Sequence, residues 1–351
     1  MYCVILAGGR GTRFWPFSRM QRPKQLLNII GDISMLQMTV DRLRKIPGVK
    51  EIFIATGADL APVIKKEVTH IKPENIIVEP SGKNTAPGIG LAALRLAALD
   101  KDEVMGVFPA DHLVVGHHEF EKAVKTAAHL ARKKKSLVTI GVNPTFPATG
   151  YGYIQFAADS DEDHLDAYRV KTFAEKPPLD LARQFLESGE FLWNSGIFVW
   201  EIGTFFSEMR RHMPDLHHSL ELIRELDVNE SIADIWNDIS AESIDYGLME
   251  KTDNIYVIKA RFEWNDVGSW NAVYDICPKN GNRNVLRGDG VILNGHDNFV
   301  QSDGRFTAVV GVDNLVVVNT ADATLVIPKD QVESVKELVE LLKNEERKDL
   351  L

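Results

Sequence analysis

The sequence has few cysteines and no long apolar run. Its 351 residues include only two cysteines, Cys3 and Cys277, which suggests two reduced thiols, although the sequence leaves a disulfide between them open. No stretch approaches the roughly 18 consecutive apolar residues of a membrane-spanning helix. The N-terminus lacks a basic region and its first apolar run ends at Gly8, too short for a signal peptide. We therefore expect a cytoplasmic protein without a membrane partner.

The sequence also lacks an excess of positive charge. Its formal net charge of -10 argues against general affinity for nucleic acids or for anionic membranes, since both attract basic proteins. Apolar residues make up 44% and charged residues 26%, as in an ordinary globular protein large enough for about two domains. Basic residues can therefore act here only as local clusters.

The stretch Val4–Lys24 combines glycines with such a cluster. An apolar run typical of a buried parallel strand is followed at once by Gly8, Gly9 and Gly11, and glycines let backbone N–H groups approach an anion closely. The same stretch holds basic residues without a nearby carboxylate in the sequence: Arg10, Arg13, Arg19, Arg22 and Lys24. Because these charges repel one another unless an anion lies among them, we predict a phosphate-binding loop rather than a simple strand-to-helix turn.

Two well-known phosphate loops are absent. The dinucleotide fingerprint needs a third glycine where Phe14 stands, and a P-loop needs Gly-Lys-Ser/Thr where Gly11 is followed by Thr12 and Arg13. The loop is therefore of another type, and a dinucleotide-dependent oxidoreductase is disfavoured.

Strand-like and helix-like segments alternate along residues 1–280. The predicted strands include Val4–Ala7, Glu51–Thr56, Asn75–Val78, Val104–Phe108 and Leu137–Val142, and the predicted helices include Ser34–Ile46, Leu60–Thr69, Ile89–Leu99 and Glu119–Lys135. This alternation is typical of a Rossmann-like, mostly parallel α/β sheet. Ligands of such sheets bind beyond the carboxyl ends of the strands, and the glycine-rich loop follows one such end.

Two aspartates are candidates for a metal site. Asp111 follows the predicted strand Val104–Phe108, and Asp266 lies in the aromatic segment Phe262–Trp270. Carboxylates at such positions suit a hard cation such as Mg²⁺. The alternative for each aspartate is a capping role at the start of a helix.

Three further segments carry glycines or polar groups that could form part of a binding site. Thr149–Tyr153 combines two glycines, Gly150 and Gly152, with the aromatic pair Tyr151 and Tyr153, which fits either a sugar-binding wall or a hairpin with an aromatic pair. Glu175 and Lys176 are neighbours beyond a strand and would point to opposite faces unless the strand end is distorted. Asn194 interrupts an apolar run, so its amide must be hydrogen-bonded by the protein or by a ligand.

The C-terminal part has a different sequence pattern. Short β-rich runs separated by Gly, Asn and Asp turns fill Asn284–Ile327, and Gln331–Leu342 has the spacing of an amphipathic helix. We predict a first domain over residues 1–280 and a small β-rich domain, ending in a helix, over residues 281–351. Its strand edges need a cover, which either a partner or the first domain could provide, and of these we expect a homodimer through this domain.

Taken together, these segments resemble the nucleotidyltransferase family that makes nucleotide sugars. The loop L-A-G-G-R-G-T-R at Leu6–Arg13, followed by Pro23-Lys24, matches the family signature, and F-A-E-K-P at Phe173–Pro177 resembles a second one. Four further segments resemble those of the family members that transfer GMP to mannose 1-phosphate. They are E-P-S-G-K-N-T-A-P at Glu79–Pro87, T-G-Y-G-Y-I at Thr149–Ile154, W-N-S-G at Trp193–Gly196 and W-N-D-V-G-S-W at Trp264–Trp270. The resemblance implies the nucleotide-diphospho-sugar transferase type of fold, with a partial left-handed β-helix-like C-terminal domain.

The resemblance also implies a reaction and roles for residues. GTP and mannose 1-phosphate would give GDP-mannose and pyrophosphate, with Mg²⁺ as cofactor. The catalytic residues would be Arg13, Lys24, Asp111 and Asp266, and the two aspartates would hold the metal. The nucleotide would be bound by Leu6, Ala7, Gly8, Gly9, Gly11, Thr12, Glu79, Pro80, Ser81, Asn84 and Thr85. The sugar phosphate would be bound by Gly150, Glu175, Lys176 and Asn194.

Two alternatives remain at this stage. One is a sibling nucleotidyltransferase that uses another hexose 1-phosphate or base, since selectivity depends on single contacts. The other is a non-catalytic subunit that senses nucleotide sugars, which would have no need of Arg13, Lys24, Asp111 and Asp266 together. Many bacterial family members continue into an isomerase domain; this chain ends too soon for one, so we expect no mannose-phosphate isomerase activity.

Overall fold

The computed structural model of the chain describes residues 1–9, 11–161, 164–227 and 230–351. These residues divide into two compact units, each discontinuous in sequence. The first unit comprises Met1–Gly8, Thr39–Ala110 and Val114–Trp264, and the second comprises Gly9–Met38, Asp111–Leu113 and Asn265–Leu351. The boundary predicted near residue 280 is based on the change in sequence pattern along the chain. The two units are instead defined by which residues pack together, and by that criterion the glycine-rich loop from Gly9 onward belongs with the C-terminal residues.

A nine-stranded sheet forms the centre of the first unit, in the order β3-β2-β1-β4-β9-β6-β10-β8-β7. Its strands are β1 (Tyr2–Leu6), β2 (Glu51–Gly57), β3 (Ile76–Glu79), β4 (Val104–Pro109), β6 (Leu137–Val142), β7 (Gly152–Asp161), β8 (His164–Glu175), β9 (Phe191–Glu201) and β10 (Ile255–Lys259). The pairings make β8 and β9 antiparallel to the other strands of this sheet. The predicted mixed, mostly parallel α/β sheet is confirmed.

The central strands are buried on both faces. Val4 of β1 is level with Val107 of β4, and both pack in one core with Ile89 of α3 (Thr85–Asp100). The next residue of β4, Phe108, points to the other face and contacts Phe120 of α4 (His117–Lys134), with 6.3 Å between the ring centroids. Strands covered on both faces read as continuous apolar runs, which is why the sequence identified them.

Helices α1 (Met35–Arg44, which begins in the second unit) and α2 (Ala61–Glu67) lie close to their predicted positions. The other helices described in the first unit are α5 (Leu179–Ser188), α6 (Ile202–His212), α7 (Pro214–Glu225) and α8 (Ala233–Asp238). Helix α3 starts at Thr85, four residues before the predicted start at Ile89. The Asn84 side chain accepts a hydrogen bond from the Thr85 N–H and so provides the cap that starts the helix earlier.

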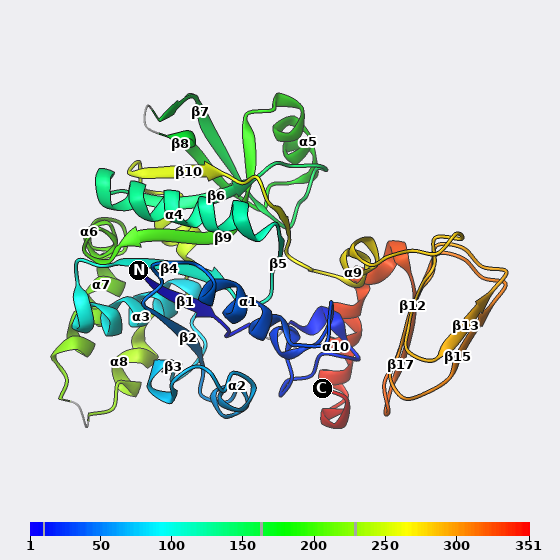
Figure 1. Ribbon diagram of the computed structural model, residues 1–351. Helices are drawn as coiled ribbons and strands as arrows, with labels where there is room; N and C mark the ends of the chain where they lie inside the picture. The colour runs from blue at the N-terminus through cyan, green and yellow to red at the C-terminus, as the bar shows by residue number, and fades with distance from the viewer. Residues whose placement is uncertain (10, 162–163, 228–229) are drawn as a thin grey trace. The chain divides into compact units, whose positions relative to one another are not determined.

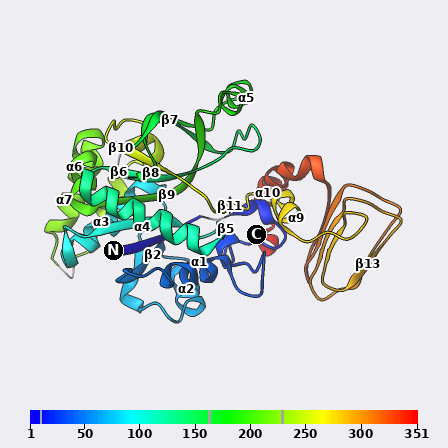
Figure 2. The same ribbon diagram turned by 45° about the horizontal axis from the view of Figure 1, so that its top comes forward.

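The β-rich segment of the second unit forms a flattened coil, seen in orange in Figure 1 and Figure 2. Strands β12 (Val285–Arg287), β14 (Phe299–Ser302) and β16 (Leu315–Asn319) pair in parallel, as do β13 (Gly290–Leu293) and β15 (Thr307–Val310). Strand β17 (Thr324–Pro328) closes the coil antiparallel to β16. Successive strands along the chain thus join the two parallel ladders in turn, which is the pattern of a short β-helix, as predicted.

The second unit has its own apolar core. Helix α10 (Val335–Asn344) presents Val335, Val339 and Leu342 to a buried cluster that includes Phe14 and Trp270, the latter being the first residue of α9 (Trp270–Ile276). The chain end is also fastened to the glycine-rich segment, because Trp15 Nε1 donates to the Leu350 carbonyl at 2.8 Å. The terminal helix therefore packs directly on the residues that follow the loop.

None of the helices described here is both long and apolar enough to cross a membrane.

Candidate active site

One pocket of the second unit gathers residues from four separate stretches of the sequence. It has a volume of about 350 Å³. Its lining residues are Gly11, Thr12, Arg13, Phe14, Lys24, Asp111, His112, Asp266, Gly268 and Lys336. Six of them were named from the sequence, including all four expected catalytic residues. We call this cavity the phosphate pocket.

Lys24 lies at the centre of the charged groups of the phosphate pocket. It starts a short 3₁₀ turn after Pro23, and its side chain is only 7% exposed. Its Nζ lies 2.8 Å from Asp111 Oδ2 and donates to the backbone carbonyl of Asp266 at 2.5 Å. A single buried ammonium group thus joins the two aspartate segments.

Gly11 is required by the backbone beside Lys24. It has φ of +51°, and a Cβ at this position would lie 2.5 Å from the Cβ of Lys24, so both the conformation and the space favour glycine. A Cβ on Gly8 or Gly9 would meet nothing within 4 Å. These two glycines therefore leave open space beside the chain, as a loop that admits a ligand would.

Asp111 is held ionised by its cationic neighbours. Burial alone would raise the pKa of this carboxyl, but the charges of Lys24 and then of His112 outweigh it and lower the pKa below its usual value. The alternative of a helix cap is wrong, because the following helix α4 has Gly116 at its N-cap. Asp111 is therefore available as an anionic ligand at neutral pH.

Asp266 lies in a tight turn with a strained neighbour. Its Oδ1 accepts the Gly268 N–H at 3.2 Å, and Val267 has φ of +48°, a conformation that is costly for a β-branched side chain and typical of functional sites. The capping alternative is wrong here as well, because Ser269 caps α9 by accepting the Ala272 N–H. The turn holds the Asp266 carboxylate without using it as a helix cap.

Three basic residues of the glycine-rich stretch, namely Arg13, Arg19 and Lys24, have carboxylate partners that are remote in sequence. Arg13 Nε lies 3.7 Å from Glu333 Oε2, and Arg19 pairs with Asp322 at 3.0 Å. The expectation that an external anion must hold this cluster together is therefore wrong for Arg19, whose partner is internal. Arg10 lies outside the described residues.

The donor set of the phosphate pocket fits Mg²⁺ better than a metal held by protein ligands alone. Within the described ranges there is no group of three or more His, Cys, Asp or Glu residues that could hold a metal ion. Asp111 and Asp266 nevertheless line the same pocket, and Mg²⁺ usually takes one or two carboxylates plus substrate phosphate oxygens and water. These two residues would hold it.

Leu6 and Ala7 fix the start of the loop in the first unit. The Leu6 carbonyl accepts the Ala110 N–H at 3.2 Å, and the Ala7 carbonyl accepts the hydroxyl of Thr56 at 3.1 Å. Their carbonyl groups thus anchor the strand end from which the loop departs.

The loop between β3 and α3 contains the other expected nucleotide-binding residues, namely Glu79, Pro80, Ser81, Asn84 and Thr85. It is anchored by residues 236–244 of the same unit. Trp236 Nε1 donates to the Ser81 carbonyl at 2.8 Å, and the Ile244 N–H donates to Thr85 Oγ1 at 2.9 Å. Asn84 has φ of +68°. The loop is therefore a shaped surface and not a loose connection.

Glu79 is a buried carboxyl at the end of β3. It is 7% exposed, and a Cβ on Gly88 of α3 would lie 2.5 Å from its Oε1. Desolvation raises its pKa to about 7. Near neutral pH Glu79 can therefore exist in either protonation state.

This raised pKa gives a test of stability against pH. A carboxyl whose pKa is higher in the folded state contributes stability that is complete below its unfolded value of 4.5 and is lost as pH rises through about 7. Glu79→Gln lacks that loss, so its unfolding free energy relative to wild type should rise by about 2–3 kcal/mol between pH 5 and pH 8. Urea titrations at both pH values measure this change. The exposed Glu74→Gln serves as control, and an equal difference at the two pH values for Glu79→Gln would refute the assignment.

Glu175 and Lys176 do meet, contrary to the simple strand rule. Glu175 ends β8, and Lys176 follows with φ of +49°, which turns its chain back so that Nζ lies 2.5 Å from Glu175 Oε1. The distortion anticipated at the strand end is thus a left-handed residue. Glu175 Oε2 is buried without a hydrogen-bond partner, and such an orphaned acceptor is a site for a ligand hydroxyl.

Asn194 is hydrogen-bonded by the protein on both sides of its amide. Its Nδ2 donates to Asp245 Oδ1 at 2.9 Å, and its Oδ1 accepts the Gly196 N–H at 3.0 Å. Desolvation, followed by the charge of Glu175, raises the pKa of Asp245 to about 6. Asp245 therefore joins Glu175 and Asn194 in one polar cluster, and no sequence motif had pointed to it.

The aromatic residues around Gly150 pack on one another. Tyr151 has its ring centroid 5.0 Å from that of Trp193 and 5.4 Å from that of Trp264, and Gly152 begins the hairpin strand β7. The hairpin alternative thus accounts for the aromatic pattern.

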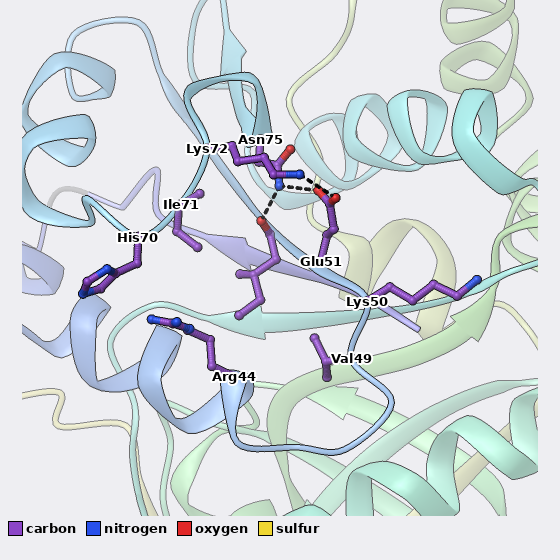
Figure 3. Close-up of a pocket in the computed structure, with 9 residues that line it drawn as sticks. Arg44, Val49, Lys50, Glu51, His70, Ile71, Lys72 and Asn75 are labelled. Atoms are coloured by element: carbon purple, nitrogen blue, oxygen red, sulfur yellow. Dashed lines mark hydrogen bonds and ion pairs between the residues drawn. The ribbon is translucent and has the colours of Figure 1, made fainter.

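A second pocket, in the first unit, contains none of the expected site residues (Figure 3). It lies where β2 and β3 begin, the opposite end of these strands from Glu79. Lys72 pairs with Glu51 at 2.9 Å, and Lys50 points away from the cavity and pairs with Glu103 at 2.5 Å. Ion pairs internal to the protein thus already satisfy two of its cations.

Comparison with known proteins finds relatives over nearly the whole chain. Residues 2–282 match the family model described as nucleotidyl transferase, and residues 288–342 match that of a MannoseP isomerase/GMP-like β-helix domain. A mannose-1-phosphate guanylyltransferase of Escherichia coli is 38% identical over 98% of this chain and 74% of its own length. The alginate biosynthesis protein AlgA of Pseudomonas aeruginosa is 35% identical over 97% of this chain and 71% of its own.

Solved structures give the same grouping. A crystal structure from Thermus thermophilus, described as a mannose-1-phosphate geranyltransferase, has a TM-score of 0.88 at 32% identity and covers 97% of this chain and 99% of its own. A UDP-glucose pyrophosphorylase complexed with UDP-glucose has a TM-score of 0.51 at 19% identity, over 78% of this chain and 95% of its own, and shares the fold alone. With its first 282 residues matched almost completely and relatives above 30% identity over nearly its whole length, the chain belongs to the nucleotidyl transferase family.

Proposed function

We propose that this enzyme transfers GMP from GTP to mannose 1-phosphate and releases pyrophosphate. The observation that carries the proposal is the phosphate pocket, where Arg13, Lys24, Asp111 and Asp266 lie together. The relatives named as mannose-1-phosphate guanylyltransferases support the choice of substrates. Enzymes for other nucleotide sugars resemble the chain only at the level of the fold, which favours guanylyl transfer over a sibling reaction.

The chemistry requires positioning and charge neutralisation but no general base. A phosphate monoester has a second pKa of about 6 and is largely dianionic at neutral pH, so its oxygen can attack the α-phosphorus directly. The new bond joins that oxygen to the α-phosphorus, and the bond to the bridging oxygen breaks, with its electron pair leaving on pyrophosphate. Preorganised cations stabilise the charge that develops in such a step.

We assign the triphosphate to the phosphate pocket. Lys24 stabilises charge at the α-phosphate, and Arg13 neutralises the departing pyrophosphate. The backbone N–H groups of Gly8, Gly9, Gly11 and Thr12 contact the β- and γ-phosphates. Mg²⁺, when bound by Asp111 and Asp266, supplies further charge neutralisation at the phosphate oxygens. Glu79 with the loop that follows it contacts the guanine base.

We assign the sugar phosphate to the polar cluster of the first unit. Glu175 Oε2 accepts a sugar hydroxyl, Asn194 and the Gly150 backbone contact others, and Lys176 binds the phosphate. The orphaned Glu175 Oε2 supports this assignment, because a buried carboxylate oxygen without a partner is costly until a hydroxyl reaches it.

Gly152→Ala tests the sugar assignment. The added Cβ would lie 2.3 Å from Glu175 Oε2 and must displace that carboxylate, so KM for mannose 1-phosphate should rise about tenfold or more, as for one lost hydrogen bond to a charged group. KM for GTP should stay constant. Gly281→Ala, whose Cβ meets nothing within 4 Å, is the matched control. A rise in KM for GTP instead of the sugar phosphate would contradict the assignment.

We further propose a homodimer through residues 281–351 and a cytoplasmic location. The β-rich coil exposes large apolar side chains, including Phe306 at 65%, Val326 at 60% and Val310 at 59%, and apolar groups gathered on one segment favour a partner surface. Both cysteines are free thiols, as expected in a reducing compartment.

The proposed reaction is tested by pyrophosphate release over a matrix of nucleoside triphosphates and sugar 1-phosphates, with and without Mg²⁺. We expect turnover with GTP and mannose 1-phosphate and a requirement for the metal. Equal turnover with UTP and glucose 1-phosphate would favour the sibling reaction. Binding of GTP without any turnover would favour a sensor.

A further inference from the structure

The terminal helix α10 places a lysine in the phosphate pocket. We propose that Lys336 binds the pyrophosphate portion of the nucleotide together with Arg13, and that Glu333 takes the place of a phosphate oxygen between them when no nucleotide is bound. This inference rests on the proposed function, since it names a further residue for the same substrate. No sequence motif assigns a role to either Lys336 or Glu333.

The geometry converges on one oxygen atom. Glu333 Oε2 lies 2.8 Å from Lys336 Nζ and 3.7 Å from Arg13 Nε. Two cations that line the same pocket therefore hold a single carboxylate oxygen between them. An anionic oxygen of a phosphate has the same charge and hydrogen-bonding capacity, so it can replace that carboxylate oxygen.

Packing fixes the position of Lys336. The residue before it, Val335, is buried, as are Val339 and Leu342 one and two turns further on. These side chains belong to the same apolar cluster as Phe14, which follows Arg13. Lys336 is also the second residue of α10, and the N-terminal end of a helix favours an anion nearby. The helix thus fixes the backbone of Lys336, from which the side chain reaches the phosphate pocket.

The ordinary explanation is a solvated ion pair between Lys336, at the start of α10, and Glu333 in the 3₁₀ segment that precedes it (Lys329–Ser334). Pairs spaced i, i+3 on exposed surfaces stabilise proteins by only about 0–1 kcal/mol, and Lys336 and Glu333 are 47% and 63% exposed. The same helix offers a matched pair for comparison: Lys343 and Glu340 have the same spacing, a separation of 2.6 Å and exposures of 45% and 63%. Of these two lysines of α10, Lys336 lines the phosphate pocket and Lys343 does not. A difference in ligand affinity between the variants of these two lysines therefore reports the contribution of the pocket and not that of an ion pair on the helix.

The test compares Lys336→Ala with Lys343→Ala. Calorimetry measures Kd for inorganic pyrophosphate and for GTP with Mg²⁺, and kinetics measures KM and kcat in both directions. Loss of one charge-assisted contact should weaken pyrophosphate and GTP binding about tenfold, while Lys343→Ala stays within about twofold of wild type. Lys336→Arg should recover most of the affinity. If Lys336→Ala and Lys343→Ala bind pyrophosphate equally, the inference is wrong.

Glu333→Gln tests the exchange of anions separately. Because the variant no longer competes with phosphate for Arg13 and Lys336, pyrophosphate should bind as tightly as in wild type or a few-fold more tightly. Weaker binding would mean that Glu333 positions the cations, and the exchange would be refuted.

These experiments can distinguish a failure of the role of Lys336 from a failure of the proposed function. Binding of pyrophosphate requires no sugar, so a Lys336-dependent Kd without formation of GDP-mannose would sink only the proposed reaction. Formation of GDP-mannose with unaltered binding in Lys336→Ala would sink only the role of Lys336.

Discussion

Lys24→Met is expected to lower kcat for GMP transfer by about 10²–10³-fold with the fold preserved. Methionine keeps the unbranched chain that fills the buried position beside Gly11 and removes only the ammonium group. The expected loss is that of one preorganised donor aimed at charge that develops in the transition state. KM for GTP should change less than kcat, because the lost contact is stronger in the transition state than in the ground state.

Lys24→Met should also change how the stability of the protein depends on pH. Lys24 lowers the pKa of Asp111, and a carboxyl with a lowered folded pKa contributes stability that is present above its unfolded value of 3.8 and is lost as pH falls through the folded value. Lys24→Met loses this contribution. The difference in unfolding free energy between wild type and variant should therefore be larger at pH 7 than at pH 3.

Lys72→Met is the control for Lys24→Met. Lys72 also forms an ion pair with a carboxylate, at 2.9 Å from Glu51, but it lines the second pocket (Figure 3). It should retain wild-type kcat. If Lys24→Met raised only KM while kcat stayed constant, Lys24 would serve ground-state binding alone.

Arg13, Lys24 and Asp111 were predictable as residues of the phosphate pocket because each carries a local signal. Arg13 and Lys24 stand in a loop after an apolar strand, and Asp111 follows another such strand. Parallel strands bring their carboxyl ends to one edge, so residues 13, 24 and 111 could be expected together. The sequence also suggested capping as an alternative for Asp111 and Asp266, and only the observed caps at Gly116 and Ser269 remove it.

The partners of those residues were not predictable, because they come from distant segments. Glu333 and Lys336 stand in a pattern that reads as an ordinary amphipathic helix with a solvated face. Their meeting with Arg13 depends on how α10 packs on the residues after the loop, and no local motif encodes that packing. The same applies to Asp245, whose carboxylate contacts Asn194 from a π-helical turn about fifty residues later.

Local backbone geometry was the other source of error. The rule that strand neighbours face opposite sides separates Glu175 from Lys176, whereas the positive φ of Lys176 brings their charged groups together. Lysine has no marked preference for this conformation, unlike glycine or asparagine. Val267 is a similar case. Both residues adjoin side chains assigned to substrate or metal, which is where such strain is expected.

Asp111→Asn and Asp266→Asn are expected to cost kcat/KM about 10²-fold or more and to raise the Mg²⁺ concentration for half-maximal activity about tenfold or more. Each substitution removes a negative charge that would neutralise the metal while keeping the size of the side chain. Titration of Mg²⁺ in the activity assay and direct titration of Mn²⁺ in the presence of GTP, by calorimetry, measure the two effects. The exposed Asp275→Asn controls for the change of net charge.

The two variants should differ in stability, and this difference separates a metal role from a structural one. Asp111 pairs with Lys24 through its carboxylate, whereas Lys24 contacts Asp266 through the backbone carbonyl. Asp111→Asn should therefore leave a buried ammonium group without its carboxylate partner and lower the unfolding free energy, while Asp266→Asn keeps an acceptor for the Gly268 N–H and should lower it less. Impaired Mn²⁺ binding in both variants, together with the larger destabilisation in Asp111→Asn, identifies a shared metal site. Wild-type metal dependence in both would assign Asp111 to holding Lys24 and would remove the metal from the phosphate pocket.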